Sequence, residues 1–282
     1  MYLRGNLVPD TMNEKIIALL KKYTKHDFVQ FTSRGNSAIF VALYCARKIN
    51  PLKYILVPDQ GGWLTYYKYP KQLELETKEV KTDFGIIDLT DLASKLDEAC
   101  AFIYCTPAGY IAEQPIKEIY DVCKKKNCLV IMDVSGSMGS DLCDGTYADF
   151  TVGSFGKWKP IDLGYGGFVT AAKKEYFEKP KEIFNTVSFE EQYYPVLLNK
   201  LEHVEERFKT LFKEVAKIKD ELKEYDIVHK DKQGIVVVVK YKTETEKQNI
   251  IDYCIAHGYE YTLCPRYIRV NCEAISIEVK RL

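Results

Sequence analysis

The sequence lacks an excess of charge of either sign. Forty lysine and arginine residues balance forty aspartate and glutamate residues over 282 positions, so the formal net charge at pH 7 is zero. A protein that binds DNA or RNA along its surface needs a basic field. Nucleic acid is therefore not expected as the main partner, and any site for an anion has to be local.

Patterns typical of metal sites, disulfide frameworks and membrane spans are also missing. The chain has nine cysteines, an odd number, with no Cys-x-x-Cys pair and only four histidines, so neither a zinc site nor a disulfide framework is expected. No run of about eighteen apolar residues occurs, and Met1–Gly5 precede no apolar signal segment. These absences predict a cytoplasmic protein with reduced thiols, no metal and no membrane contact.

Glycine becomes scarce in the last third of the chain. Fourteen of the sixteen glycines precede residue 170, and because glycine serves tight turns and close backbone approach, we expect the chemistry in this first part. There, short apolar runs alternate with helical patterns. The runs predict strands at 28–32, 54–57, 101–105, 129–132, 150–154 and 167–170, and helices at 37–48 and 116–126. This alternation is typical of an α/β domain with a mostly parallel sheet.

The second part of the chain begins with an amphipathic pattern. Apolar residues recur every three or four positions from Leu197 to Leu222, which predicts a long connecting helix. The rest predicts a strand at 235–241, a helix at 245–257 and strands at 267–270 and 274–279. We therefore expect a large domain over 1–188, a connecting helix over 189–225 and a small C-terminal α/β domain over 226–282.

Two strand ends in the large domain carry residues suited to binding a ligand. Gly35, Asn36 and Ser37 open a helix, whose unpaired N–H groups and partial positive charge suit a phosphate. An ordinary capped helix start explains the same residues. Asp133 ends the strand at 129–132, on the edge where open α/β sheets bind ligands. Aspartates that cap a turn or a helix are also common at such positions.

A third strand end carries a more specific motif. The strand at 150–154 leads into Ser154–Lys159 (SFGKWK), and Gly164–Gly167 (GYGG) follow. Together with Asp133, this order and spacing resemble pyridoxal-phosphate enzymes of the aspartate aminotransferase fold (fold type I), and most closely the DegT-like sugar aminotransferases. The resemblance covers about 135 residues of the first part, up to Thr170. It implies that fold for the large domain, and pyridoxal 5′-phosphate as the cofactor.

The resemblance implies roles for individual residues. Lys159 takes the place of the lysine that forms a Schiff base with the cofactor aldehyde and then moves the proton, which requires a neutral amine near pH 7. Asp133 takes the place of the carboxylate that keeps the pyridine nitrogen protonated. The Ser154 hydroxyl would hold the phosphate together with the helix start. Trp63 corresponds to an aromatic residue that stacks on the cofactor ring, and the alternatives are a core tryptophan or a position in a solvent-lined loop.

Three features depart from the family pattern. Lys157 fits the Ser-x-x-Lys motif of amino-acid aminotransferases and competes with Lys159 for the covalent role, although the ungapped run to Gly166 favours Lys159. Three residues after the aspartate, where the family has glutamine or histidine at the ring, this chain has Gly136. The chain is also short for the family, so an acceptor smaller than a nucleotide sugar is expected.

Further candidate residues concern the substrate. Arg266 and Arg269 lie in the small domain, and a guanidinium group suits a donor carboxylate, with surface pairing to glutamate as the alternative. Tyr110 follows a strand end and would either shape the substrate pocket or pack against the next helix. Cys264 is compatible with the mobile nucleophile of a cysteine desulfurase, or is simply buried.

The sequence thus predicts a PLP-dependent aminotransferase that moves an amino group from an amino-acid donor to a keto or aldehyde acceptor. The resemblance also implies a homodimer with small-molecule partners. A PLP-dependent lyase or a cysteine-desulfurase-like enzyme on the same fold is the alternative, because these reactions diverge only after the carbanion forms. A non-catalytic, partner-binding relative is the third, and the combination of Asp133, Ser154 and Lys159 argues against it.

Overall fold

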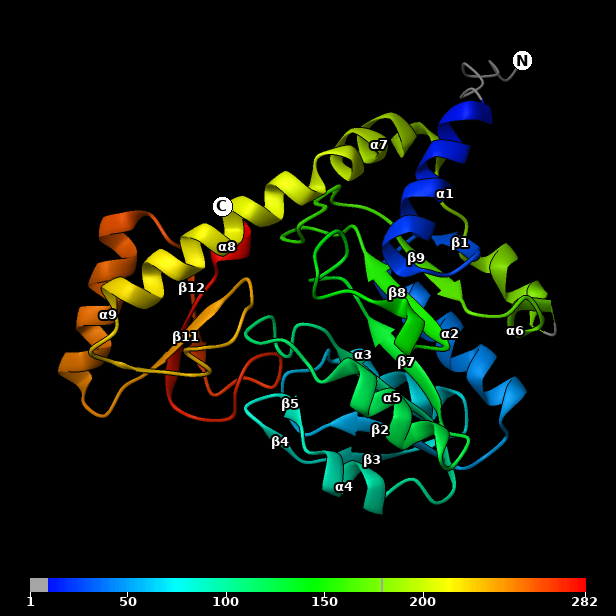
Figure 1. The fold of residues 1–282 in the computed structure, drawn as a ribbon, viewed down its shortest axis with the longest axis horizontal. Coiled ribbons are helices and arrows are strands. Elements are labelled where there is room, and N and C mark those ends of the chain that lie inside the picture. The colour runs from blue at the N-terminus through cyan, green and yellow to red at the C-terminus, as the bar shows by residue number, and fades with distance from the viewer. Residues whose placement is uncertain (1–9, 179) are drawn as a thin grey trace.

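A sheet of seven strands forms the centre of the large domain (Figure 1). The protein is described by a computed structural model that covers residues 10–178 and 180–282, so Met1–Gly5 lie outside it. In their order across the sheet, the strands are β1 (Phe28–Thr32), β9 (Gly167–Ala171), β8 (Phe150–Ser154), β7 (Leu129–Asp133), β6 (Ala99–Cys105), β2 (Tyr54–Pro58) and β3 (Glu76–Val80). The five strands from β8 to β3 run parallel, whereas β9 is antiparallel to both its neighbours. The mostly parallel sheet expected from the sequence is confirmed.

Helices cover both faces of this sheet. One buried cluster contains residues of α2 (Gly35–Ile49), α3 (Thr65–Gln72) and α6 (Glu175–Glu178). The other contains residues of α1 (Asp10–Thr24), α4 (Leu89–Ser94) and α5 (Ile116–Lys124). In β7, Leu129 and Ile131 belong to the first cluster and Val130 and Met132 to the second. Since alternate side chains are buried on opposite faces, the strand has a continuous apolar sequence.

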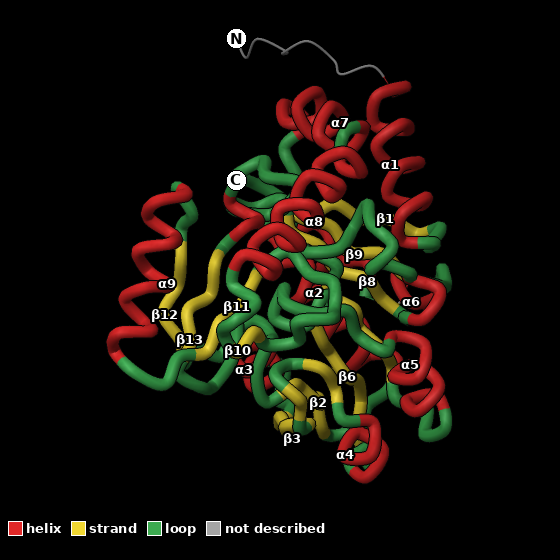
Figure 2. The backbone as a smooth tube through the Cα atoms, turned by 60° about the vertical axis from the view of Figure 1, so that its left-hand side comes forward, coloured by secondary structure: helices red, strands yellow, loops and turns green. Residues whose placement is uncertain are grey.

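The small domain is built on a four-stranded antiparallel sheet. Its strands, in spatial order, are β10 (Asp226–Ile227), β11 (Val237–Lys240), β13 (Ala274–Ile277) and β12 (Tyr261–Cys264). Helix α9 (Glu244–His257) covers the side of this sheet that faces away from the large domain (Figure 2). A two-stranded hairpin, β4 (Thr82–Asp83) and β5 (Ile86–Ile87), completes the described strands. Within residues 10–178 and 180–282, no helix combines the length and apolar character needed to cross a bilayer.

The single connecting helix expected from the sequence is interrupted. The structure has α7 (Tyr194–Glu202) and α8 (Val204–Glu221), separated at His203. The His203 imidazole Nδ1 donates to the Asn199 carbonyl oxygen at 2.7 Å, which is the acceptor that a continuous helix would pair with the His203 backbone N–H. That N–H instead donates to the Leu201 carbonyl. The apolar stripe predicts the helical residues, but the His203 side chain competes for a backbone acceptor and divides the helix in two.

The strand predicted at 267–270 is wrong, because the segment forms a loop after β12 that contacts the large domain. The Tyr267 hydroxyl donates to the Pro58 carbonyl at 3.1 Å, and the Gly61 backbone N–H donates to the Tyr267 carbonyl at 2.7 Å. Tyr267 therefore serves a contact between the two domains. An edge strand of the small sheet is instead formed by β12, which begins six residues earlier in the chain.

Candidate active site

A cavity of about 530 Å³ lies between the carboxyl ends of the parallel strands and the small domain. Nearly all the candidate residues from the sequence line it: Gly35, Asn36, Trp63, Tyr110, Asp133, Ser154, Lys157, Lys159, Arg266 and Arg269. Ser37 and Cys264 do not line it. The fold therefore brings together groups that are spread over more than 230 positions of the chain, at the edge where open α/β sheets bind ligands.

Asp133 is held at the end of β7 by two donors. Its carboxylate is buried and accepts a hydrogen bond from the Tyr66 hydroxyl at 2.8 Å and from the Ser135 backbone N–H at 3.0 Å. Burial, together with the charge of Asp133, raises the pKa of Tyr66 well above its usual range. Tyr66 therefore remains a neutral donor, and the carboxylate is fixed in one orientation toward the cavity.

The Lys159 amine lies among aromatic rings in the loop after β8. It donates a hydrogen bond to the Tyr110 hydroxyl at 2.7 Å, and its Nζ is 5.0 Å from the ring centroid of Trp63. Burial lowers the pKa of Lys159, while the charge of Asp133 acts in the opposite direction. A lysine whose pKa is lowered by desolvation is more readily available as a neutral amine.

Lys157 has different surroundings, although it also lines the cavity. Its side chain is exposed, and its Nζ lies 4.7 Å from the ring centroid of Trp158. Lys159 donates to the buried Tyr110, whereas Lys157 makes no side-chain hydrogen bond within the described part of the chain. The surroundings of the two amines therefore favour Lys159 for chemistry that requires desolvation.

The start of α2 and the end of β8 meet in a tight contact. A Cβ atom placed on Gly35 would lie 2.4 Å from the Ser154 Cβ, so only glycine fits at this position. The Ser154 hydroxyl therefore stands beside the first turn of α2, where backbone N–H groups lack intrahelical partners. The Ser37 side chain lies outside the cavity, with its hydroxyl 3.3 Å from that of Ser33. A hydroxyl beside a helix start forms a cradle suited to a phosphate group.

Trp63 joins this cradle to the lysine. Its indole Nε1 donates to the Asn36 side-chain oxygen at 2.8 Å, and its ring stands beside the Lys159 amine. The indole is partly buried and lines the cavity, so it is a wall of the site and not a core tryptophan. A planar aromatic wall is suited to packing against another flat ring.

The glycine at position 136 is explained by Tyr110. A Cβ atom on Gly136 would lie 2.5 Å from both Cδ1 and Cε1 of the Tyr110 ring. The ring therefore fills the space into which a side chain at 136 would project. This chain therefore has glycine where the family has a larger residue, because the Tyr110 ring occupies the space of that side chain.

The two arginines of the small domain have different roles. Arg269 is buried, and its guanidinium forms a fork with Glu278, with Nε–Oε1 at 3.0 Å and Nη2–Oε2 at 2.6 Å. Arg266 is exposed at the cavity and has no side-chain hydrogen bond within the described part of the chain. Cys264 is buried and does not line the cavity, and burial raises the pKa of its thiol. Arg266 is therefore the better placed of the two for a substrate carboxylate.

Lys280 is a residue of the site that sequence reasoning missed. It is buried and lines the cavity, with its Nζ 3.4 Å from Glu278 Oε2 and donating to the Trp158 carbonyl at 3.2 Å. Burial lowers the pKa of Lys280 to about 7, although the charge of Glu278 opposes this. The only signal in the sequence is a group of charged residues after an apolar strand, which does not reveal where that group points.

Comparison with known families identifies the large domain. The model of the DegT/DnrJ/EryC1/StrS aminotransferase family matches residues 11–194. The chain belongs to this family. Residues 205–282 match a second model, the MJ1341 family C-terminal domain. No curated protein matches the sequence.

Solved structures share the fold of this DegT family member over nearly its whole length. A DegT DnrJ EryC1 StrS aminotransferase from Brucella abortus is 16% identical with a TM-score of 0.74, covering 98% of this chain and 86% of that one. A cysteine desulfurase from Thermococcus onnurineus NA1 is 14% identical with a TM-score of 0.71, covering 94% and 78%. A serine palmitoyltransferase from Sphingomonas wittichii is 14% identical with a TM-score of 0.74, covering 98% and 71%. The PLP-dependent transferase fold expected from the sequence is confirmed.

Membership of the DegT family makes pyridoxal 5′-phosphate the cofactor of this chain. The residues of the cavity fit it. The contact between Gly35 and Ser154 provides a cradle for the phosphate, and a buried carboxylate and a desolvated amine line the same cavity. These are the groups that the pyridine nitrogen and the aldehyde of the cofactor require.

Proposed function

We propose that the protein is an aminotransferase that moves an amino group from an amino-acid donor to a keto or aldehyde acceptor. The observation that carries this proposal is the single cavity lined by the Lys159 amine, the Asp133 carboxylate and the start of α2. Bound pyridoxal phosphate supplies an electron sink for the carbanion that forms when the donor loses its α-proton. The protein binds and orients the cofactor and the donor, and its side chains move the protons.

Lys159 and Asp133 divide the proton chemistry in this proposal. Lys159 would hold the cofactor aldehyde through its amine, and once freed the amine would take the proton from the donor α-carbon and deliver it to the C4′ carbon of the cofactor. Burial lowers the pKa of Lys159 and favours the neutral base that this step needs. Asp133, oriented by Tyr66, keeps a proton on the pyridine nitrogen.

The remaining candidate residues bind the cofactor and the donor. The Ser154 hydroxyl and the backbone N–H groups of Gly35, Asn36 and Ser37 hold the phosphate. Trp63 would pack against the cofactor ring. Arg266 pairs with the donor carboxylate from the small domain, with Tyr110 shaping the pocket and Arg269 supporting the loop through Glu278. The cavity of about 530 Å³ supports small-molecule substrates.

The assembly in this proposal is a cytoplasmic homodimer with reduced cysteines. Two large apolar side chains at the cavity, Leu64 and Trp158, are 49% and 39% exposed. Exposed apolar side chains that gather at a site often mark a surface covered by a partner. A second copy of the chain over this opening would shield the cavity from water.

A single-turnover assay tests the proposed reaction. The cofactor-loaded protein is mixed with glutamate or another amino acid, and the products are analysed. Aminotransfer predicts one equivalent of 2-oxo acid per site, whereas sulfide or alanine from cysteine would indicate the desulfurase alternative, and loss of carbon dioxide a lyase. Lys159→Ala should abolish 2-oxo acid formation, while the control Lys157→Ala should retain it.

A simpler measurement addresses the non-catalytic alternative. Purified protein that shows no cofactor absorbance, and gains none when pyridoxal phosphate is added, would leave only a partner-binding role. The proposal predicts saturable binding of one cofactor per chain.

A further inference from the structure

We infer that Tyr110 is the positioning residue of Lys159, and that Gly136 leaves the space in which the tyrosine ring stands. The Tyr110 hydroxyl is the only hydrogen-bond partner of the Lys159 amine within residues 10–178 and 180–282. The contact between Tyr110 and Lys159 is independent of the cofactor, and only its effect on catalysis rests on the proposed function. The contact itself belongs to the protein alone.

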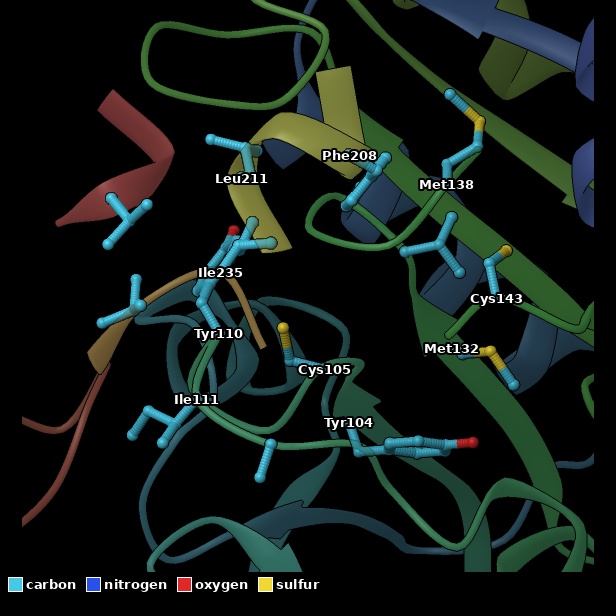
Figure 3. Close-up of a cluster of buried hydrophobic side chains, with 14 of the residues drawn as sticks. Tyr104, Cys105, Tyr110, Ile111, Met132, Met138, Cys143, Phe208, Leu211 and Ile235 are labelled. Carbon is cyan, nitrogen blue, oxygen red and sulfur yellow. The ribbon is translucent and has the colours of Figure 1, made fainter. Parts of the chain in front are cut away.

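The Tyr110 ring is fixed from several elements. The residue is 6% exposed, and its backbone adopts a left-handed conformation with φ at 70°. Its N–H donates to the Pro107 carbonyl at 3.0 Å, and its carbonyl accepts from the Ile235 N–H at 2.8 Å. Figure 3 shows Tyr110 beside Ile235, near Cys105 of β6 and Leu211 of α8. Its hydroxyl is therefore presented to Lys159 by both domains.

Gly136 determines where the ring can lie. With a Cβ atom at 136 only 2.5 Å from two ring carbons, any other residue would push the ring aside. Because the ring is confined by the core on its other sides, it has little room to yield. The hydroxyl and the lysine would then separate. Gly136 thus acts on Lys159 through Tyr110.

The hydroxyl remains neutral at working pH, so its oxygen accepts from Lys159 without placing a negative charge beside the amine. Burial raises the pKa of Tyr110 well above its usual range. A hydroxyl oxygen accepts a stronger hydrogen bond from an ammonium group than from a neutral amine. The charged and titratable groups that also face Lys159 come from β6, β7 and the small domain: Cys105, Asp133, Arg269, Glu278 and Lys280. Since none of these changes in a Tyr110→Phe variant, the variant isolates the hydroxyl.

Removal of the hydroxyl should therefore shift the titration of Lys159. Cofactor-free protein is labelled by reductive methylation over a series of pH values, and the Lys159 peptide is quantified by mass spectrometry. Tyr110→Phe should lower the midpoint of Lys159 labelling by about one pH unit, the equivalent of a hydrogen bond to a charged group. Superimposable profiles of the wild type and the folded variant would overturn the inference.

Tyr104→Phe is the matched control. Tyr104 is also a fully buried tyrosine, and its hydroxyl has no hydrogen-bond partner in the part of the chain that the structure describes. This variant should leave the Lys159 profile unchanged. An equal shift in Tyr104→Phe would show a general packing effect and contradict the assignment.

Gly136→Ala tests the second half of the inference. Displacement of the ring should shift the Lys159 midpoint in the same direction as Tyr110→Phe, and an unchanged midpoint in the folded variant would overturn the role of Gly136. Thermal unfolding confirms that each variant is folded, and Tyr110→Phe decides alone if Gly136→Ala does not fold. The labelling uses cofactor-free protein, so it does not depend on the proposed reaction. A shifted midpoint in a protein that transfers no amino group would contradict the proposed function and still support the contact between Tyr110 and Lys159.

Discussion

At the scale of single residues, surroundings decide which groups can do chemistry. Lys157 and Lys159 are chemically identical and two positions apart, but only Lys159 is desolvated in a wall of aromatic rings. Asp133 is oriented by Tyr66 and Ser135, both of which are donors. The site is therefore specified by the second layer of residues as much as by the groups that would touch the cofactor.

Asp133→Asn should slow amino transfer without emptying the site. The variant cannot stabilise a proton on the pyridine nitrogen, so the single-turnover rate should fall by about 10²-fold or more, a typical effect of removing a preorganised charge. The phosphate cradle is untouched, so cofactor still binds. The control is Asp97→Asn, because Asp97 is exposed and pairs only with Lys126 among the described residues. A rate within about twofold of the wild type would contradict the role of Asp133.

Lys280 should make stability depend on pH in the alkaline range. Its pKa in the folded protein is about 7, below the ordinary value of 10.5. Between these values the unfolded chain binds more protons than the native one, so the free energy of unfolding rises with pH from about 7 toward 10. Urea unfolding at pH 7 and pH 9 should show this gain in the wild type and in Lys68→Met, and a clearly smaller gain in Lys280→Met, where only other buried lysines such as Lys159 contribute. An equal increase in the free energy of unfolding in all three proteins would contradict the role of Lys280.

At the scale of elements, the loop from β12 to β13 depends on a buried ion pair. Arg269 forks onto Glu278, which is also 3.4 Å from Lys280. The three groups tie the end of the small domain to the wall of the cavity. Loss of the carboxylate would leave two buried cations without a partner.

Glu278→Gln should therefore destabilise the protein by about 3–5 kcal/mol at pH 7. Burial raises the pKa of Glu278, but the positive charges of Arg269 and Lys280 together outweigh burial and hold this pKa at about 2, below its ordinary 4.5. The stabilisation is complete above pH 4.5 and is lost as the pH falls through about 2. Urea unfolding at pH 7 and pH 3 should show a smaller difference between wild type and variant at pH 3. Glu260→Gln, which removes an exposed partner of Arg281, should cost little.

Elements whose signal is local could be predicted from the sequence, and others could not. The buried runs of β6, β7 and β8 are apolar on both faces, so they stood out as parallel strands. The loop at 267–270 also contains apolar residues, but its Tyr267 forms hydrogen bonds with Pro58 and Gly61, more than 200 positions away in the chain. No periodicity reports such a contact. The same holds for His203, whose side chain interrupts an otherwise continuous helical pattern.

The site residues also divide into those with a local sequence signal and those that depend on distant contacts. Asp133, Ser154 and Lys159 follow strand ends in a fixed order, so family spacing was enough to select them. Tyr110 and Gly136 depend on a contact between two loops, and Lys280 comes from the end of the other domain. Their placement required the fold.

At the scale of the whole molecule, one buried cluster joins the two domains. Phe208 and Leu211 of α8 and Ile235 before β11 belong to the same cluster as Tyr110 and Met138 of the large domain (Figure 3). Helix α8 crosses from one domain to the other (Figure 1). The cavity between the domains is therefore bounded by a shared core, which fixes Arg266 and Lys280 relative to the strand ends.

The exposed apolar side chains at the cavity predict a dimer. Sedimentation should give twice the chain mass of 32.5 kDa, and Leu64→Glu should shift the population toward the single chain, because a charge would be buried in the interface. Val196→Glu is the control, since Val196 is equally exposed on α7 but does not line the cavity. A wild-type protein with the mass of one chain at micromolar concentration would contradict the prediction.

The central claim is that the Lys159 amine bonds to the cofactor. Borohydride reduction of the cofactor-loaded protein makes such a bond permanent, and peptide mass mapping then locates it. The account predicts one modified site per chain, with the pyridoxyl label on Lys159. A label on Lys157, or the absence of any label on protein that has bound the cofactor, would contradict it.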